Sequence, residues 1–171
     1  EMLSRRGEGL EGRTAIVSGS GNVAIYAIEK LQQLGAKAIT ASDSSGYVVD
    51  EAGIDLELLK QLKEVERVRI SEYAERRRSA RFVPDRRVWE VPGHVAIPAA
   101  TQNELDGDDA AALIAGGVIA VSEGANMPST PEAVEAFQAA GVLFAPGKAA
   151  NAGGVATSAL EMSQNASRQR W

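Results

Sequence analysis

Hydrophobic positions near the start of the chain follow two different spacings. Residues 13–18 form a short run rich in β-branched side chains, which is typical of a buried strand. After a Gly-rich turn, apolar residues recur at the three- and four-residue spacing of a helix, at Val23, Ala27, Ile28, Leu31 and Leu34. Residues 37–42 then form a second apolar run. A strand, a helix and a strand within about thirty residues predict the βαβ unit of a parallel sheet.

Short apolar runs and helical patterns continue to alternate along the rest of the chain. Further strands are predicted at residues 95–97, 119–121 and 143–144. Helices are predicted at residues 56–65, 71–78, 106–115, 131–140 and 154–168. This alternation predicts an α/β fold of the Rossmann type, with a doubly wound, mostly parallel sheet and helices on both faces.

Composition limits the classes of function that the chain can have. Its 171 residues suit one domain, and its net charge of −5 argues against binding to nucleic acid or to an anionic membrane surface. The longest apolar run, residues 110–121, is interrupted by Gly116 and Gly117 and is too short to span a bilayer. The absence of cysteine excludes disulfides, thiol nucleophiles and Cys-type zinc sites. We therefore expect a cytoplasmic protein without a metal site.

The Gly-rich turn after the first strand matches a phosphate-binding pattern. Residues 19–24 read GSGNVA, which fits G-x-G-x-x-A. Gly19 permits a sharp turn from strand to helix, Gly21 lets the backbone approach a pyrophosphate, and Ala24 lets the helix pack closely on the sheet. The free N–H groups and the dipole of the helix start would hold the phosphates. The alternative is a tight strand-to-helix turn that binds no ligand.

The second strand ends in an acid whose neighbours bear on the choice of cofactor. Asp43 stands where a carboxylate accepts hydrogen bonds from the adenosine ribose of NAD. Ser44 and Ser45 follow it, and hydroxyl groups can donate to the 2′-phosphate of NADP. Residues 67–87 also carry eight arginines, of which one or two could reach a 2′-phosphate. The sequence therefore favours NADP, with NAD as the alternative.

Three later segments complete a series of motifs in the same order as in one family. They are residues 98–104 (PAATQNE), 123–128 (EGANMP) and 146–158 (PGKAANAGGVATS), which follow residues 18–24 and 41–46. Together these motifs cover nearly the whole chain. The chain thereby resembles the glutamate, leucine, phenylalanine and valine dehydrogenases, and among them the bacterial NADP-linked glutamate enzymes.

The resemblance implies a place along the cofactor for each motif. The pyrophosphate would be held by Gly19, Ser20, Gly21, Asn22 and Val23. The adenosine ribose and any 2′-phosphate would meet Asp43 and Ser44. The nicotinamide ribose would lie along Ala100, Thr101 and Gln102, and the carboxamide would meet Asn126 and Asn151.

One departure from the family pattern affects the 2′-phosphate. NADP-linked relatives often carry a lysine shortly after the Asp-Ser-Ser turn, and Glu66 aligns with that position here. A carboxylate would repel the phosphate, so Arg67 or Arg69 would have to replace the lysine.

The resemblance also implies where substrate binds and where the chemistry lies. Val155 and Ser158 would line the substrate pocket, and the Ser158 hydroxyl would bond the side-chain carboxylate of glutamate. A polar group at this position favours glutamate over apolar amino acids, because a buried hydroxyl would otherwise lose its partner. The catalytic lysine and aspartate of the family belong to a separate substrate domain, so we expect no catalytic residue within this chain. Residues 1–11 would be the tail of a helix that connects the two domains, and residues 12–171 the dinucleotide-binding domain of a fragment that also lacks C-terminal helices.

The expected function is therefore the cofactor-binding half of an enzyme for the reversible oxidative deamination of L-glutamate to 2-oxoglutarate and ammonia with NADP(H). Alone, the chain would bind cofactor without turnover, and the full-length protein would form a homohexamer. Three alternatives are a free-standing NAD(P)-sensing regulatory module, a dehydrogenase for another amino acid, and an interaction domain with a degenerate site. Both glycines of the phosphate turn are present, which disfavours an interaction domain with a degenerate site.

Overall fold

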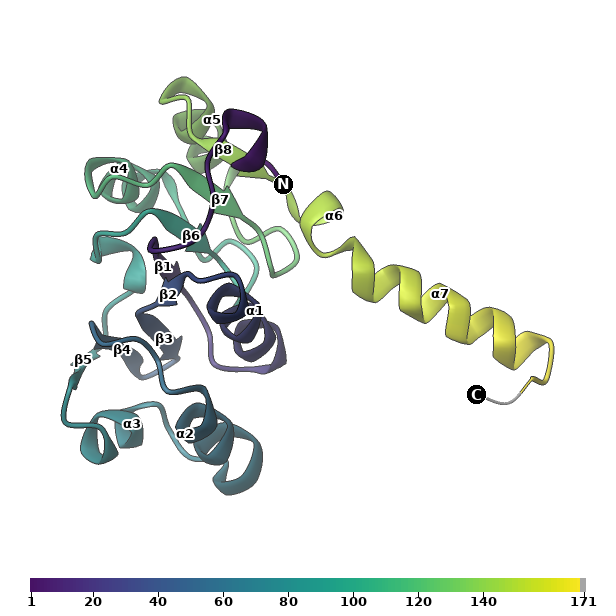
Figure 1. Ribbon diagram of the computed structural model, residues 1–171, viewed down its shortest axis with the longest axis horizontal. Coiled ribbons are helices and arrows are strands. Elements are labelled where there is room, and N and C mark those ends of the chain that lie inside the picture. Colours follow the sequence, from purple (N-terminus) through teal and green to yellow (C-terminus); the bar gives the residue numbers. More distant parts are fainter. Residues whose placement is uncertain (170–171) are drawn as a thin grey trace.

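A five-stranded parallel sheet forms the centre of the protein. The computed structural model describes residues 1–169; residues 170 and 171 lie outside the described part. The strands follow the order β2-β1-β6-β7-β8. Their bounds are Lys37–Ala38 (β2), Thr14–Val17 (β1), Val95–Ile97 (β6), Ala120–Ser122 (β7) and Leu143–Ala145 (β8). This order and direction confirm the predicted doubly wound α/β fold (Figure 1).

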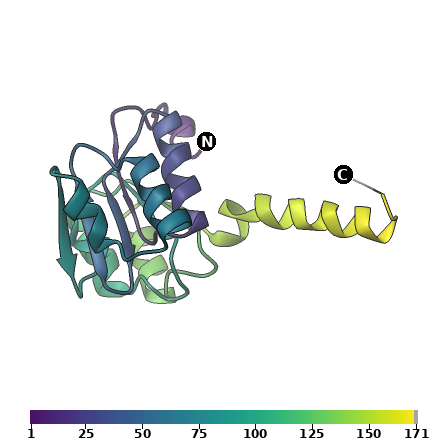
Figure 2. The same ribbon diagram turned by 90° about the horizontal axis from the view of Figure 1, so that it is seen from below.

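Helices cover both faces of this sheet because alternate strand residues point to opposite sides. Ala15 and Val17 belong to one apolar cluster, whereas Ile16 belongs to the other. The first face carries α1 (Asn22–Gln33), α2 (Leu56–Lys60) with the π-helical segment Gln61–Glu66, and α3 (Ser71–Arg76). The second face carries α4 (Gly107–Ala115), α5 (Pro131–Ala139) and the 3-10 turn Val88–Glu90. Figure 2 shows the helical layers from another side.

The predicted second strand, residues 37–42, is divided into two strands, of which only β2 belongs to the parallel sheet. The chain leaves the parallel sheet there and continues as β3 (Thr40–Asp43), which pairs antiparallel with β4 (Gly46–Asp50) and through it with β5 (Ala80–Pro84). The buried Thr40 hydroxyl accepts a hydrogen bond from Val17 N at 2.8 Å and donates to Val17 O at 2.9 Å. A side chain thus replaces backbone pairing with β1, and the backbone of β3 is free to pair with β4.

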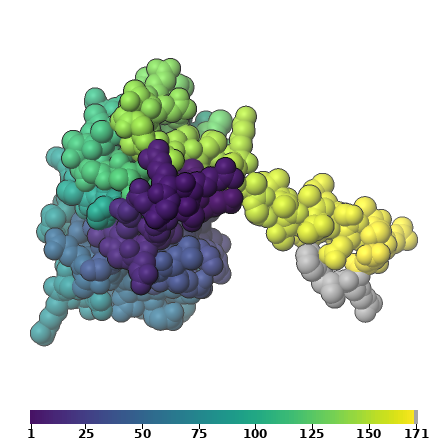
Figure 3. Space-filling model, turned by 45° about the horizontal axis from the view of Figure 1, so that its top comes forward, coloured from purple at the N-terminus to yellow at the C-terminus, as the bar shows by residue number. Residues whose placement is uncertain are grey.

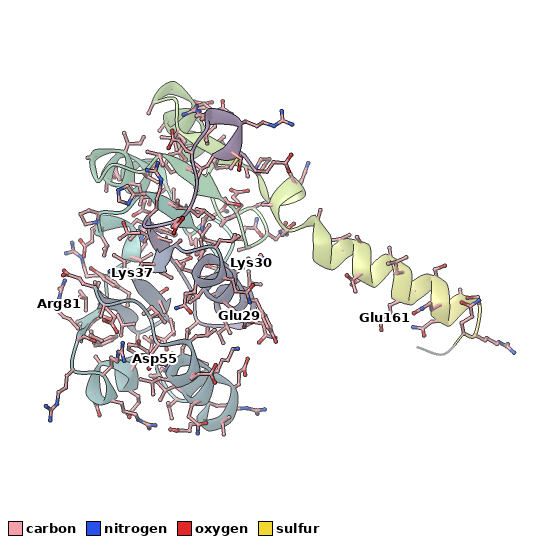
Figure 4. The ribbon with its side chains drawn as sticks, viewed as in Figure 1. Glu29, Lys30, Lys37, Asp55, Arg81 and Glu161 are labelled. Atoms are coloured by element: carbon pink, nitrogen blue, oxygen red, sulfur yellow. The ribbon has the colours of Figure 1, made fainter. Side chains whose placement is uncertain are left out.

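Contacts between α1 and α2 hold the first helical face together. Glu29 on α1 forms an ion pair with Lys60 at the end of α2, at 2.9 Å. Figure 4 labels Glu29, and it also labels Asp55, which precedes α2. The Asp55 carboxylate accepts from Leu58 N at 3.1 Å and so caps this helix.

The two ends of the described chain differ in how they meet the body. In place of the helix tail expected for residues 1–11, the structure has one 3-10 turn, Ser4–Arg6, which ends at Gly7 in a left-handed conformation (φ 73°). This segment lies on the surface of the body (Figure 3). The short helix α6 (Gly147–Ala150) leads into α7 (Ala152–Ala166), which projects from the body (Figure 1). No helix within residues 1–169 is long and apolar enough to cross a bilayer.

Candidate functional site

A cleft of about 880 Å³ opens where β1, β3 and β6 reach their carboxyl ends. Its lining includes residues 18–23 after β1, residues 42–44 at the tip of β3 and residues 99–101 after β6. Ligands of doubly wound proteins bind at this edge of the sheet, where strand order reverses between the two halves. The sequence-predicted residues Gly19, Ser20, Gly21, Asn22, Val23, Asp43, Ser44, Ala100 and Thr101 all lie in this one cleft.

The turn after β1 is fixed on two sides. Gly19 has φ +81°, and a Cβ on it would lie 3.0 Å from Ala99 O, so only glycine fits without strain. Gly19 N donates to Ser42 Oγ at 2.7 Å, and Ser42 N donates to Gly19 O at 2.9 Å. Ser18 Oγ accepts from Ala99 N at 2.8 Å. These bonds join the turn to the tip of β3 and to the loop after β6.

Gly21 is a glycine that the backbone does not require. Its φ of −85° suits any residue, and a Cβ on it would meet no atom within 4 Å. Gly21 stands at the N-cap of α1, which has no side-chain cap, although Asp55, Asp106 and Thr130 cap α2, α4 and α5. The first N–H groups of α1 are therefore available at the cleft, together with the positive end of the helix dipole. This arrangement suits an anionic group that approaches the backbone closely.

The Asp43 carboxylate is engaged by the protein itself. Oδ1 accepts from Ser45 N at 2.9 Å and from Ser45 Oγ at 2.6 Å. Oδ2 accepts from Ile70 N at 2.9 Å and from Lys63 Nζ at 3.4 Å. Burial alone would raise the pKa of the Asp43 carboxyl, but the bonds from Ser45 and Ile70 outweigh burial and hold this pKa below its usual value. Four donors thus surround a group with about four acceptor positions.

A cationic side chain stands beside Ser44 at the same end of the cleft. Arg69 Nη1 donates to Ser44 Oγ at 2.6 Å, and both residues are exposed. The Glu66 carboxylate forms two hydrogen bonds of 2.7 Å with Arg76, and Arg76 lowers the pKa of Glu66. The negative charge that departs from the family pattern is therefore paired with Arg76, while Arg69 faces Ser44.

Glu104 organises the loop after β6. Its Oε1 accepts from Ala100 N at 2.9 Å and from Thr101 N at 3.3 Å. Burial raises the pKa of the Glu104 carboxyl, against the opposing effect of its bonds to Ala100 and Ser18. Glu104 belongs to the motif at residues 98–104, and no role was predicted for it. An acid directly beside Gln and Asn at the end of an apolar strand is the signal that could have identified it.

Four further cleft residues were also missed as site residues. Arg86, Arg87, Val88 and Trp89 line the cleft from the segment after β5. Trp89 is buried, and its Nε1 donates to Glu104 O at 3.2 Å. Arg87 pairs with Asp106 at 2.9 Å and with Asp109, beside the start of α4. The arginine-rich composition of this segment indicated charge but not position, because β5 itself was not predicted.

A second group of predicted residues adjoins the cleft without lining it. Within residues 1–169, the cleft lining includes neither Gln102 nor Asn126 nor Asn151. Asn151 Nδ2 donates to Ala125 O at 3.3 Å, which places Asn151 against the loop that carries Asn126. A Cβ on Gly124 would lie 3.1 Å from Val23 Cγ1, so this loop packs against the wall of the cleft.

The predicted substrate residues lie apart from both groups. Val155 and Ser158 are exposed on α7, which extends away from the body (Figure 1). Figure 4 labels Glu161 on the same helix, far from the sheets. Residues 1–169 contain no cluster of three or more His, Asp or Glu side chains that could hold a metal ion.

Comparison with known proteins places this chain among amino-acid dehydrogenases. The family model described as Glutamate/Leucine/Phenylalanine/Valine dehydrogenase matches residues 1–171. An NAD(P)-specific glutamate dehydrogenase from Xylanibacter ruminicola is 57% identical over 174 residues, which cover 100% of this chain and 39% of the relative. An NADP-specific glutamate dehydrogenase from Escherichia coli K12 is 58% identical over 173 residues, which cover 99% of this chain and 38% of the relative.

Solved structures agree with the sequence relatives. A glutamate dehydrogenase from Plasmodium falciparum superimposes with a TM-score of 0.92 at 47% identity, over 99% of this chain and 37% of that chain. The chain thus spans about two fifths of the length of the proteins that it matches. A matching family model over the full sequence, close relatives and a shared fold lead to one conclusion. The chain belongs to the glutamate/leucine/phenylalanine/valine dehydrogenase family.

Proposed function

We propose that this chain is the NADP-binding part of a dehydrogenase that interconverts L-glutamate with 2-oxoglutarate and ammonia. The observation that carries this function is Gly21, where a side chain would fill the space in front of the uncapped start of α1. A helix N-terminus whose backbone N–H groups are not covered by a side chain suits a pyrophosphate. The names of the relatives, NADP-specific and NAD(P)-specific glutamate dehydrogenase, support the substrate and the cofactor.

The residues of the cleft fit a dinucleotide along its length. Residues 19–23 would hold the pyrophosphate, and Ala100 and Thr101 would lie beside the nicotinamide ribose, on a loop that Glu104 keeps in place. Asn126 and Asn151, which adjoin the cleft without lining it, would meet the carboxamide as donor and acceptor. When bound, the oxidised nicotinamide would accept a hydride from the α-carbon of the substrate, and the reduced nicotinamide would donate one to it. The chain supplies orientation and hydrogen-bond donors.

The adenosine end favours NADP through Ser44 and Arg69. The Ser44 hydroxyl and the Arg69 guanidinium would both donate to a 2′-phosphate, for which arginine is well suited. Asp43 would contribute by holding the Ser44 turn and the segment before Ile70 together, because its own acceptor positions are taken. NAD would bind more weakly because it leaves Arg69 without an anionic partner.

The remaining parts of the active enzyme would come from outside this chain. We assign residues 12–171 to the dinucleotide-binding domain and residues 1–11 to the connection toward a substrate domain that carries the catalytic lysine and aspartate. Val155 and Ser158 on α7 would then reach the substrate in the assembled enzyme, with the Ser158 hydroxyl bonding the side-chain carboxylate of glutamate. We also propose that the full-length protein is a homohexamer in the cytoplasm.

Removal of the Arg69 side chain tests the cofactor assignment. In calorimetric titrations, Arg69→Ala should weaken NADPH binding by about 10- to 100-fold, the cost of a lost charge-assisted hydrogen bond, and leave NADH binding within about twofold. Arg78→Ala is the matched control, because Arg78 is also exposed but lies beyond α3. Equal loss of NADPH and NADH affinity would contradict a 2′-phosphate contact at Arg69. Absence of binding of both dinucleotides to the unmodified chain would refute the proposed function as a whole.

The isolated chain should bind NADPH and show no turnover. Purified protein mixed with glutamate and NADP should give no increase in absorbance at the NADPH band, because the chain would lack the residues that move protons to and from the substrate. Addition of the purified substrate domain, or use of the full-length enzyme, provides the positive control. A saturable, glutamate-dependent rate from the chain alone would place the catalytic groups within it.

A further inference from the structure

Glu123 is a buried acid that connects two loops near the cleft. It directly follows β7, and only 5% of its surface is exposed. Its Oε1 accepts from Ser129 N at 3.2 Å, and its Oε2 accepts from Gly147 N at 2.6 Å. Burial of an isolated carboxylate is costly unless hydrogen bonds compensate for the lost water. Each oxygen of Glu123 has such a bond, and both donors are backbone groups.

The two donors belong to different loops that carry the two asparagines of the nicotinamide end. Ser129 closes the loop after β7, which contains Asn126, and Gly147 begins the short helix α6 after β8, which leads to Asn151. The loops also touch directly, because Asn151 Nδ2 donates to Ala125 O at 3.3 Å. A Cβ on Gly147 would lie 3.1 Å from Ala125 O, so the packing around the carboxylate is close.

The same loops are tied to the wall of the cleft. The backbone N–H groups of Gly124 and Ala125 both donate to Pro98 O, at 2.9 and 3.0 Å. Asn103 N donates to Met127 O at 3.0 Å. A displacement of the loop after β7 would therefore also move the segment that contains Ala100 and Thr101.

A carboxylate is the side chain that this position requires. Two N–H donors approach from two loops, and a carboxylate offers an acceptor oxygen to each. Glutamine has nearly the same shape but only one oxygen, so its NH₂ group would face either Ser129 N or Gly147 N. One of the two loops would then lose its anchor and would leave a buried donor unpaired.

Resting on the function proposed above, we infer that Glu123 is a positioning residue for the nicotinamide half of the cofactor. It holds Asn126 and Asn151 at a fixed separation by bonding both of their loops. The adenosine half of the cleft depends on other contacts, namely those of Ser42 with Gly19 and of Asp43 with Ser45 and Ile70. Loss of the Glu123 anchor should therefore affect one half of the cofactor and spare the other.

Two ligands of the chain separate these halves. Calorimetry on Glu123→Gln should show NADPH bound about 10-fold more weakly, or worse, while adenosine 2′,5′-bisphosphate, which lacks the nicotinamide half, binds within about twofold of the unmodified chain. The amide proton resonance of Gly147 in ¹⁵N spectra should move upfield, because its bond to a charged acceptor is lost or weakened. Glu135→Gln, an exposed acid on α5, is the matched control and should change neither ligand.

The possible results distinguish this role from a purely structural one. Equal loss of both ligands, or no loss of either, overturns the positioning role of Glu123. If Glu123→Gln does not fold, Glu123→Asp keeps both oxygens but withdraws them by one methylene, and it should show the same selective loss of NADPH to a smaller degree. An unmodified chain that binds neither ligand would instead refute the proposed function, which is a different outcome.

Discussion

Replacement of Gly46 by alanine should destabilise the protein by about 3–5 kcal/mol, a large part of the 5–15 kcal/mol that stabilises a typical domain. Gly46 begins β4 and pairs with Asp43 on one side and with Pro84 on the other. Its φ is +140°, and a Cβ on it would overlap the Val83 carbonyl oxygen and lie 2.9 Å from the Pro84 Cα. Both obstacles are backbone atoms, so a side-chain rotation cannot relieve them. Urea denaturation followed by circular dichroism measures the free energy of unfolding.

Gly141→Ala is the matched control for the conformational part of this effect. Gly141 also has a left-handed φ of +71°, but a Cβ on it would meet no atom within 4 Å. The expected loss is about 1–2 kcal/mol, the cost of a left-handed conformation for an L-residue. A Gly46→Ala variant no less stable than Gly141→Ala would show that the three-stranded sheet adjusts around the methyl group.

Substitution of Gly21 by valine should weaken NADPH binding by at least about 100-fold and leave stability nearly unchanged. The backbone angles of Gly21, φ −85° and ψ −173°, are extended and suit a β-branched residue. The side chain would occupy the space in front of α1 that we assign to the pyrophosphate. The free energy of unfolding should change by only about 0.5–1 kcal/mol, the difference between glycine and an apolar residue at an N-cap. Calorimetry with NADPH and thermal unfolding measure the two quantities separately.

Gly153→Val provides the comparison, because Gly153 also has open space around its Cα but lies on α7, away from the cleft. It should leave NADPH affinity unchanged. Gly21→Ala should give an intermediate loss. If Gly21→Val bound NADPH as tightly as the unmodified chain, the pyrophosphate could not lie at the start of α1.

The parts of the fold that could be predicted are those with a local signal. The unit of β1, α1 and β2 follows from apolar spacing and from the glycines at positions 19 and 21. The split between β2 and β3 has no such signal, because threonine is enriched in strands in general and does not mark a change from one sheet to another. Its effect comes from a long-range bond to Val17 that only the folded chain reveals. For the same reason β4 and β5, which form the antiparallel sheet with β3, were not predicted.

The cleft was predicted as a set of residues but not as a network. Motif spacing brought Gly19, Asp43 and Thr101 to one edge of the sheet, and the structure places all three in one cleft. Motif spacing could not show that the Asp43 carboxylate is surrounded by protein donors, because one of these donors, Ile70, is far along the chain. The roles of Glu104 and Glu123 were not predicted for a similar reason. Their partners are backbone N–H groups, which no sequence pattern indicates.

The reciprocal bonds between Ser42 and Gly19 have a consequence for how a ligand is received. These bonds fix the turn after β1 against the tip of β3 before any ligand enters the cleft. The conformational entropy of ordering this turn is therefore lost when the chain folds, and not when a ligand binds. A ligand of this cleft therefore meets backbone N–H donors that are already in place. Little of its binding free energy is then lost in ordering the turn.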